Sequence, residues 1–162
     1  MRWFLGALLA LLLSSPAQAG VYHFDPFFNV LTIHMDGGGL YLSYDGQANE
    51  AASNGTLVKI NGVCASACTL FLRNTHVCIT EKARLGFHAA ASLVPTGRGR
   101  DSRDRDTPGY YKIIDPDFTK NVMYPQYPKW VQKWIDDNDA FKTRRMTWMS
   151  FDYAKRFIEV CA

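Results

Sequence analysis

The stretch NGVCASACTLFL, residues Asn61–Leu72, sets a small serine between two cysteines at the start of an apolar run. Its first half predicts a turn at the end of a strand, and its second half predicts a short helix from Ser66 to Asn74. Further along, the segment LGFHAA ends its apolar part at His88. The residues alone leave two interpretations open. Ser66 is a nucleophile with His88 as its base, or Ser66 caps the helix and His88 is a buried histidine bonded to the backbone.

The segments around this stretch alternate between extended and helical patterns. In order, we expect a strand at Val30–Met35, a glycine turn at Asp36–Gly39, a helix at Leu40–Asn54, a strand at Leu57–Ile60, a turn at Gly62–Ala65, and, after the helix that begins at Ser66, short extended pieces at His76–Ile79 and Ala83–His88. Strands that alternate with helices predict crossover connections and a mostly parallel sheet. The expected fold class is therefore α/β.

Composition changes in the second half of the chain. The segment Pro95–Gly109 holds arginines and aspartates with almost nothing apolar, which predicts a flexible charged loop. The following residues, Tyr110–Pro128, are aromatic and predicted to be irregular. An apolar face predicts a helix over Lys129–Asn138, and Ser150 can cap a last helix over Phe151–Val160.

The first 19 residues, 1–19, have the pattern of a secretory signal peptide. Arg2 forms a short positive region, Trp3–Leu13 is an apolar run, and Ala17–Ala19 is a small-residue cleavage pattern. The apolar run is shorter than the roughly 20 residues that span a bilayer. We therefore expect an exported protein, periplasmic or secreted, with one domain over residues 20–162 and no membrane span in the mature chain.

The charge balance gives no reason to expect a polyanionic partner. The chain has 18 lysines and arginines against 15 acidic residues, and removal of Arg2 with the signal leaves one basic side chain fewer. A net charge so close to zero argues against nucleic acid and against an anionic membrane surface as partners.

Export changes how the four cysteines are interpreted. Outside the reducing cytosol an even set predicts two disulfides, with three connectivities to choose from. The set is Cys64, Cys68, Cys78 and Cys161. A zinc site formed by the first three of these with His76 is the less favoured alternative.

Two glycine-bearing turns are expected at the carboxyl ends of strands, where α/β sheets bind ligands. The turn Asp36–Gly39 offers backbone N–H groups, and Ser66 lies at a helix N-terminus, where the helix dipole favours negative charge. With His88 arriving on the next strand, these are the components of an acyl-transfer site.

These motifs resemble the Clp-protease/crotonase-like superfamily, and most closely a group of small exported bacterial proteins with a C-x-S-A-C-T turn and a GFHAA strand. The resemblance covers about Val30–Ala90. The G-x-A-x-S turn of the Clp nucleophile matches Gly62, Cys64 and Ser66 here, and the Clp histidine matches His88.

The resemblance also implies the oxyanion hole, because DGGG stands where the Clp subunit has S-P-G-G. It makes Gly38 and Ala67 the backbone donors. At the position of the Clp triad aspartate this chain has Met146. The site is then a triad with a displaced acid, which is left open among Asp136, Asp137 and Asp139, or a Ser-His dyad, or an inactive relic. For the cysteines, the resemblance implies that Cys78 pairs with Cys161 and Cys64 with Cys68.

Two classes of function follow. The first is an exported serine hydrolase of the peptidase or esterase type that acts on a peptide or small ester and needs no cofactor. The second is a non-catalytic binding or assembly module on the same fold. An acyl-CoA reaction fits poorly because coenzyme A is not expected outside the cytoplasm. A homo-oligomer is compatible with the resemblance, since relatives assemble as rings or trimers.

Overall fold

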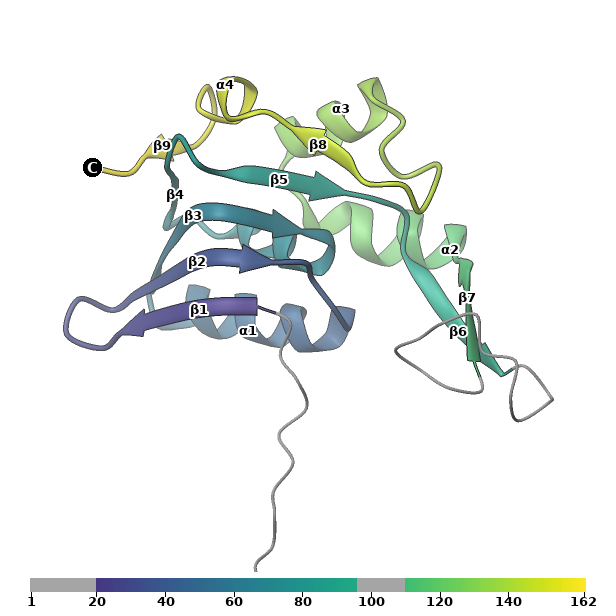
Figure 1. Ribbon diagram of the computed structural model, residues 1–162, viewed down its shortest axis with the longest axis horizontal. Helices are drawn as coiled ribbons and strands as arrows, with labels where there is room; N and C mark the ends of the chain where they lie inside the picture. Colours follow the sequence, from purple (N-terminus) through teal and green to yellow (C-terminus); the bar gives the residue numbers. More distant parts are fainter. Residues whose placement is uncertain (1–19, 96–109) are drawn as a thin grey trace, which may run out of the picture.

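The structure is a computed structural model that describes residues 20–95 and 110–162 of the chain. The expected signal peptide and nearly all of the expected charged loop lie outside these described residues. Within them, the chain forms a single mixed α/β domain with a mostly parallel sheet and helices (Figure 1).

The main sheet has seven strands, and most of their pairings are parallel. The order is β1-β2-β3-β4-β9, with β5 paired to β3 and β8 paired to β5. Strands β1 and β8 are antiparallel to their partners, and the other pairings are parallel. The strands are β1 (Gly20–Asp25), β2 (Val30–Asp36), β3 (Leu57–Ala65), β4 (Val77–Ile79), β5 (Arg84–Phe87), β8 (Thr147–Met149) and β9 (Glu159–Val160).

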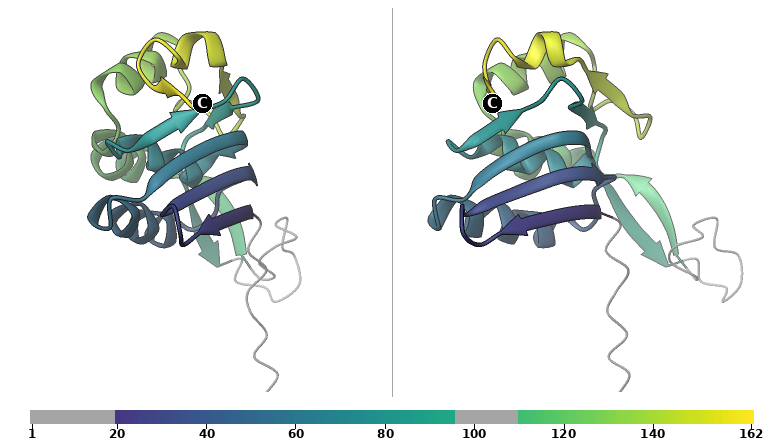
Figure 2. Two further views of the ribbon diagram at one scale, coloured as in Figure 1. Left: turned by 90° about the vertical axis from the view of Figure 1, so that its left-hand side faces the viewer. Right: turned by 60° about the vertical axis from the view of Figure 1, so that its left-hand side comes forward.

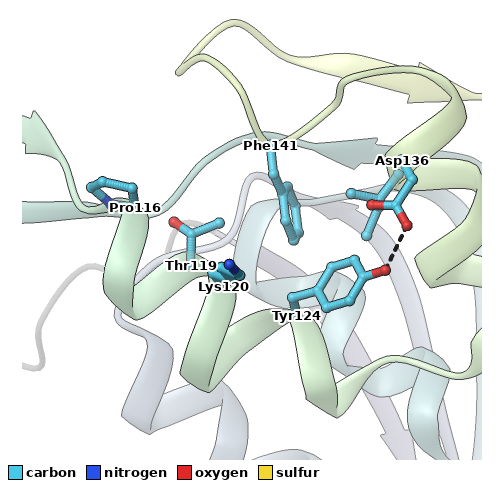
Figure 3. Close-up of a pocket in the computed structure, with 7 residues that line it drawn as sticks. Pro116, Thr119, Lys120, Tyr124, Asp136 and Phe141 are labelled. Carbon is cyan, nitrogen blue, oxygen red and sulfur yellow. Dashed lines mark hydrogen bonds between the residues drawn. The ribbon is translucent and has the colours of Figure 1, made fainter.

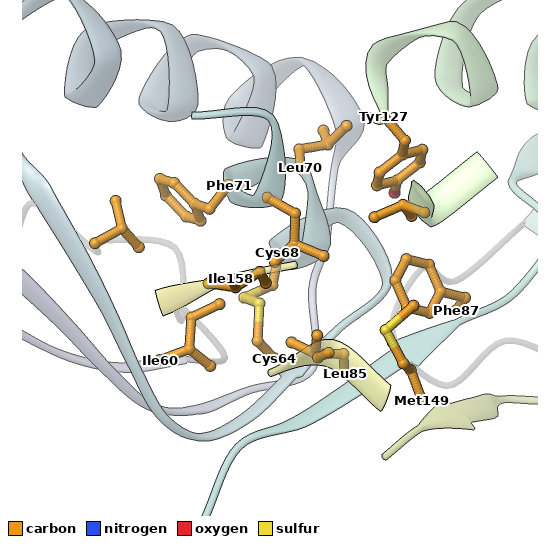
Figure 4. Packing of buried hydrophobic residues seen from close by; sticks show 14 of the residues in the cluster. Ile60, Cys64, Cys68, Leu70, Phe71, Leu85, Phe87, Tyr127, Met149 and Ile158 are labelled. Atoms are coloured by element: carbon orange, nitrogen blue, oxygen red, sulfur yellow. A yellow bond between two sulfur atoms is a disulfide. The ribbon is translucent and has the colours of Figure 1, made fainter. Parts of the chain in front are cut away.

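The longer helices lie on one face of this sheet, as the two views of Figure 2 show. They are α1 (Tyr41–Ser53), the 3-10 helix η1 (Ser66–Arg73) and α3 (Lys129–Asp137). The core fills the space between them and the sheet (Figure 4). The largest of its fully buried side chains are at most 1% exposed, and they are Phe71, Phe87, Ile33, Ile60 and Leu70.

Strand β3 changes partners along its length, and this positions the candidate site. Its first half pairs with β4, and its last residues pair with β5, so that Ala65 lies opposite Gly86. On the other side, Cys64 lies opposite Asp36 at the end of β2. Because all three strands are parallel, the carboxyl ends of β2, β3 and β5 meet at one edge of the sheet.

The predicted turn at Gly62–Ala65 is wrong, because these residues continue β3 to its end. The strand needs glycine at position 62 for another reason: a Cβ there would collide with the carbonyl oxygen of His34 on β2. The register between β2 and β3 shifts at this point. A close approach of two strands, and not a turn, explains the glycine.

The segment predicted to be irregular, Tyr110–Pro128, is largely ordered. It begins with β7 (Tyr110–Ile114), which pairs with β6 (Ala91–Pro95) in a hairpin that projects from the main sheet (Figure 2). The rest of the segment forms short helical turns, namely α2 (Pro116–Phe118), the π-helical turn η2 (Thr119–Met123) and the 3-10 turn η3 (Tyr124–Gln126).

The last helix is shorter than predicted, and β1 was not predicted at all. Helix α4 covers only Phe151–Ala154, with Ser150 as its cap, and the chain then turns into β9 beside β4. Ile158 is buried in the core, and Cys161 is bonded to Cys78. Burial and the disulfide therefore hold the end of the chain as a strand.

Candidate functional site

Ser66 occupies the junction where β3 ends and η1 begins. Its backbone has φ of 55°, in the left-handed region that a residue with a Cβ adopts at a cost of roughly 1–3 kcal/mol. The Ser66 side chain is half-buried, and its Oγ makes no hydrogen bond with any described residue. The serine is therefore not acting as a helix cap, and its hydroxyl is left free at a strained strand-to-helix turn.

A disulfide encloses this turn. Cys64 is bonded to Cys68, with their Cα atoms 5.3 Å apart, and Ser66 lies midway between them in sequence. The second disulfide joins Cys78 to Cys161. Both pairings that the resemblance implies are confirmed. The zinc interpretation is wrong, because no cysteine is left as a free thiol.

The glycine turn packs directly against the serine turn. Gly38 has φ of +79°, and a Cβ built on it would lie 2.5 Å from the Ala65 oxygen, 2.6 Å from Ser66 Cβ and 2.8 Å from the Ala67 nitrogen. Real Cβ atoms do not approach other atoms this closely. Glycine is therefore required at position 38 both for its backbone conformation and for this contact.

Asp36, the last residue of β2, lies beneath the glycine turn and is fully buried. Its Oδ1 accepts hydrogen bonds from Gly38 N at 2.8 Å and from Tyr44 OH at 2.7 Å, while Tyr22 OH donates to Oδ2. Burial is the main cause that raises the pKa of Tyr22, and the hydrogen bond to Asp36 is the second. Burial is also the main cause that raises the pKa of Tyr44 to about 12. Sequence reasoning treated this aspartate only as part of a turn.

The bond to Asp36 bears on the expected oxyanion hole. The N–H of Gly38, the predicted first donor, already points at the Asp36 carboxylate. The N–H of Gly39 makes no hydrogen bond within the described part of the chain. Ala67 lies in the first turn of η1, where N–H groups lack a partner inside the helix. The free donors at this edge are thus Gly39 and Ala67, and Gly38 can contribute only by sharing or breaking its bond to Asp36.

His88 follows β5 at the same edge of the sheet. Ala65 is paired with Gly86 across β3 and β5, so Ser66 lies one residue beyond this pair and His88 lies two beyond it. The Nδ1 atom of His88 is 2.7 Å from the carbonyl oxygen of Ala89. Because a carbonyl only accepts, Nδ1 carries the proton, and the lone pair of the neutral ring is on Nε2.

The described residues contain no hydrogen bond between Ser66 and His88, nor any ion pair or hydrogen bond from an aspartate to His88. The three candidate acids have other partners. Asp136 accepts from Tyr124 OH at 2.6 Å, Asp137 pairs with Lys133, and Asp139 pairs with Lys142. Met146 lies against Gly86, where a Cβ would come within 2.7 Å of its sulfur. A backbone carbonyl thus occupies the position relative to His88 that a carboxylate has in a triad.

A pocket of about 430 Å³ opens between the segment that follows β7 and the end of α3 (Figure 3). Ile135 and Phe141 contribute apolar walls, and the hydrogen bond to Asp136 raises the pKa of Tyr124 to about 12. Ala90, shortly after His88, donates to Thr119 Oγ1 in the wall. Neither Ser66 nor His88 lines the pocket. The complete lining is Pro116, Thr119, Lys120, Tyr124, Ile135, Asp136 and Phe141.

The two disulfides are consistent with a location outside the cytoplasm. In the described ranges, no helix has the length and apolar character needed to cross a bilayer. The chain matches no family model, no curated protein and no solved structure. The Clp/crotonase-like assignment therefore stays a prediction that rests on the sequence motifs.

Proposed function

We propose that this protein is an exported serine hydrolase of the peptidase or esterase type, with Ser66 as nucleophile and His88 as general base. The observation that carries the proposal is the contact between two turns. A free serine hydroxyl in a left-handed strand-to-helix turn lies against a glycine turn, and both turns offer backbone N–H groups. A strained serine between a strand and a helix also characterises the nucleophile of many hydrolases.

The proposed reaction follows from these groups. His88 Nε2 takes the proton of the Ser66 hydroxyl as Oγ attacks the carbonyl carbon of the substrate. The carbonyl oxygen becomes an oxyanion, which accepts hydrogen bonds from Ala67 N–H and from the glycine turn. The imidazolium then protonates the leaving amine or alcohol as its bond to carbon breaks. Water, deprotonated in turn by His88, hydrolyses the acyl-serine and regenerates the hydroxyl.

The proposed enzyme is slow, because the partner of His88 Nδ1 is the Ala89 carbonyl. A carbonyl dipole fixes the same tautomer as a carboxylate, but it stabilises the imidazolium less. In a serine-protease triad it is the carboxylate that stabilises the imidazolium formed during acylation. We therefore expect acylation to be detectable with a reactive probe before turnover of a natural ester or amide is detectable.

A fluorophosphonate tests the proposal on the purified protein. Intact mass and peptide mapping should find the adduct on Ser66 in the peptide Ile60–Arg73. Ser66→Ala should abolish the adduct, and His88→Ala should slow labelling by about 10² to 10⁴-fold. His76→Ala is the control, because His76 is exposed and remote from the site, and it should label at the wild-type rate. Labelling that persists in Ser66→Ala would contradict the proposal.

The second candidate function is a non-catalytic binding module, and the pocket in Figure 3 favours it. That pocket is large enough for a small ligand, it is mostly apolar, and it contains neither Ser66 nor His88. An inert Ser66 together with a ligand that contacts Tyr124 and Phe141 would support the binding module over the hydrolase.

A further inference from the structure

Asp36 is a fully buried carboxylate that the proposed reaction does not use. Its three hydrogen-bond donors among the described residues come from three parts of the fold: Tyr22 from β1, Tyr44 from α1, and Gly38 from the glycine turn. The two tyrosine hydroxyls also contact each other, at 2.9 Å. No basic side chain of the described residues pairs with this carboxylate, so hydrogen bonds alone compensate its burial.

A buried carboxylate binds its hydrogen-bond donors strongly. Each hydrogen bond that is lost leaves more of the free-energy cost of burial uncompensated. Burial raises the pKa of Tyr22 and of Tyr44, so both hydroxyls are protonated donors at neutral pH. Tyr44 also reaches the turn through its ring, since a Cβ on Gly39 would lie 3.3 Å from Tyr44 Cε2. The carboxylate and the ring therefore hold the turn from below.

We propose that Asp36 is a positioning residue that fixes the glycine turn against Ser66, with Tyr22 and Tyr44 holding its carboxylate in place. The inference rests on the proposed hydrolase function for its catalytic consequence, but the anchoring of the turn can be measured without it. Because Asp36 accepts the hydrogen bond from Gly38 N–H, it sets the orientation of the neighbouring peptide, which carries the free N–H of Gly39.

Tyr44→Phe is the most informative variant, because it keeps the ring and removes one donor. The Asp36 carboxyl then has one hydrogen-bond donor fewer. The turn becomes less firmly anchored, so its backbone N–H groups are held less precisely where the oxyanion forms. This effect slows acylation. Asp36→Ala would remove the anchor entirely, at the risk of unfolding. Asp36→Asn should retain more activity than Asp36→Ala, because an amide oxygen can still accept from Gly38.

Thr56→Val is the matched control. Thr56 is 6% exposed and donates a hydrogen bond to Asn29 at 2.9 Å, at the opposite end of β3 from Ser66. The variant thus loses one buried hydroxyl without touching the turn. Two quantities are measured on wild type, Tyr44→Phe and Thr56→Val: the exchange rate of the Gly38 amide by ¹⁵N NMR, and the rate constant for fluorophosphonate labelling of Ser66.

We expect Tyr44→Phe to speed Gly38 exchange at least about tenfold and to slow labelling by about 10- to 100-fold, as the loss of a hydrogen bond to a charged group allows. Thr56→Val should leave both rates near wild type. Equal effects of the two variants on both rates would overturn the inference. If the wild type does not label at all, the proposed function fails. The exchange rate of the Gly38 amide then tests the anchoring by itself. Faster exchange in Tyr44→Phe alone supports anchoring by Asp36, and an unchanged exchange rate in Tyr44→Phe overturns it.

Discussion

Gly38 is the residue on which the candidate site depends most directly. It has a left-handed backbone, and its Cα lies against the Ser66 turn with no space for a methyl group. We expect Gly38→Ala to push the two turns apart and to slow fluorophosphonate labelling of Ser66 by about 10²-fold or more, comparable to the loss of one oxyanion donor. The labelling rate constant measures this directly.

Gly46→Ala is the control for the Gly38 substitution. Gly46 lies inside α1, and a Cβ there meets nothing within 4 Å. This variant should keep the wild-type labelling rate and gain about 0.5–1 kcal/mol in stability, because alanine suits a helix better than glycine. A Gly38→Ala protein that is folded and labels as fast as Gly46→Ala would show that the contact between the turns does not matter for reactivity.

At the same scale, the sequence indicated that Ser66, His88 and the glycine turn follow strand ends, but it gave Asp36 no role beyond the turn. Motifs that lie at strand ends can be assigned from local patterns, because a parallel sheet brings those ends to one edge. The role of Asp36 depends on Tyr22 and Tyr44, which come from an unpredicted strand and from a helix face. Only the three-dimensional arrangement brings these hydroxyls to the carboxylate.

The elements were predicted best where glycine, proline or asparagine marked a clear boundary. Strand β2, helix α1 and helix α3 begin and end within one residue of expectation. The errors fall where long-range pairing decides. The pairing of β6 with β7 and of β9 with β4 gives extended structure to segments with weak local signals. The tail after α4 continues a helical pattern, but burial of Ile158 and the bond at Cys161 override it.

Asp115 joins the projecting hairpin to α2. It accepts hydrogen bonds from Ser92 Oγ on β6 and from the Phe118 N–H at 2.9 Å, as the N-cap of α2. These two hydrogen bonds lower the pKa of Asp115, and the one from Ser92 has the larger effect. A carboxyl whose pKa is lower in the folded state stabilises the fold above its unfolded pKa, and the contribution is lost as pH falls through the lowered value.

We therefore expect Asp115→Ala to be less stable than wild type at pH 7, with the difference in the free energy of unfolding shrinking as the pH is lowered past about 3.9. Denaturant unfolding at several pH values measures this difference. Asp117→Ala is the control, because Asp117 is exposed and caps nothing. A difference for Asp115→Ala that is independent of pH would mean that the charge of the carboxylate plays no part.

At the scale of the whole molecule, the two disulfides have different roles. One mainly stabilises the fold, and the other mainly constrains the geometry of the candidate site. Cys78–Cys161 connects residues 83 positions apart and ties the segment after β9 to β4. Cys64–Cys68 spans four positions and encloses the Ser66 turn. In the chain-entropy treatment the stabilisation grows with the length of the closed loop, to about 4.5 kcal/mol for the long loop against about 2 kcal/mol for the short one.

The effects of the two disulfides on stability and on labelling should therefore differ when each pair of cysteines is replaced in turn. Replacing Cys78 and Cys161 together by alanine should lower the free energy of unfolding by about 4–5 kcal/mol and leave the labelling rate of Ser66 nearly unchanged under conditions where the protein stays folded. Replacing Cys64 and Cys68 should cost about half as much stability. It should nevertheless slow labelling, because the left-handed Ser66 backbone loses the constraint that holds it. Guanidinium unfolding and labelling kinetics on both variants measure these effects. Equal loss of labelling from both variants would show that reactivity follows overall stability and not the local geometry of the Ser66 turn.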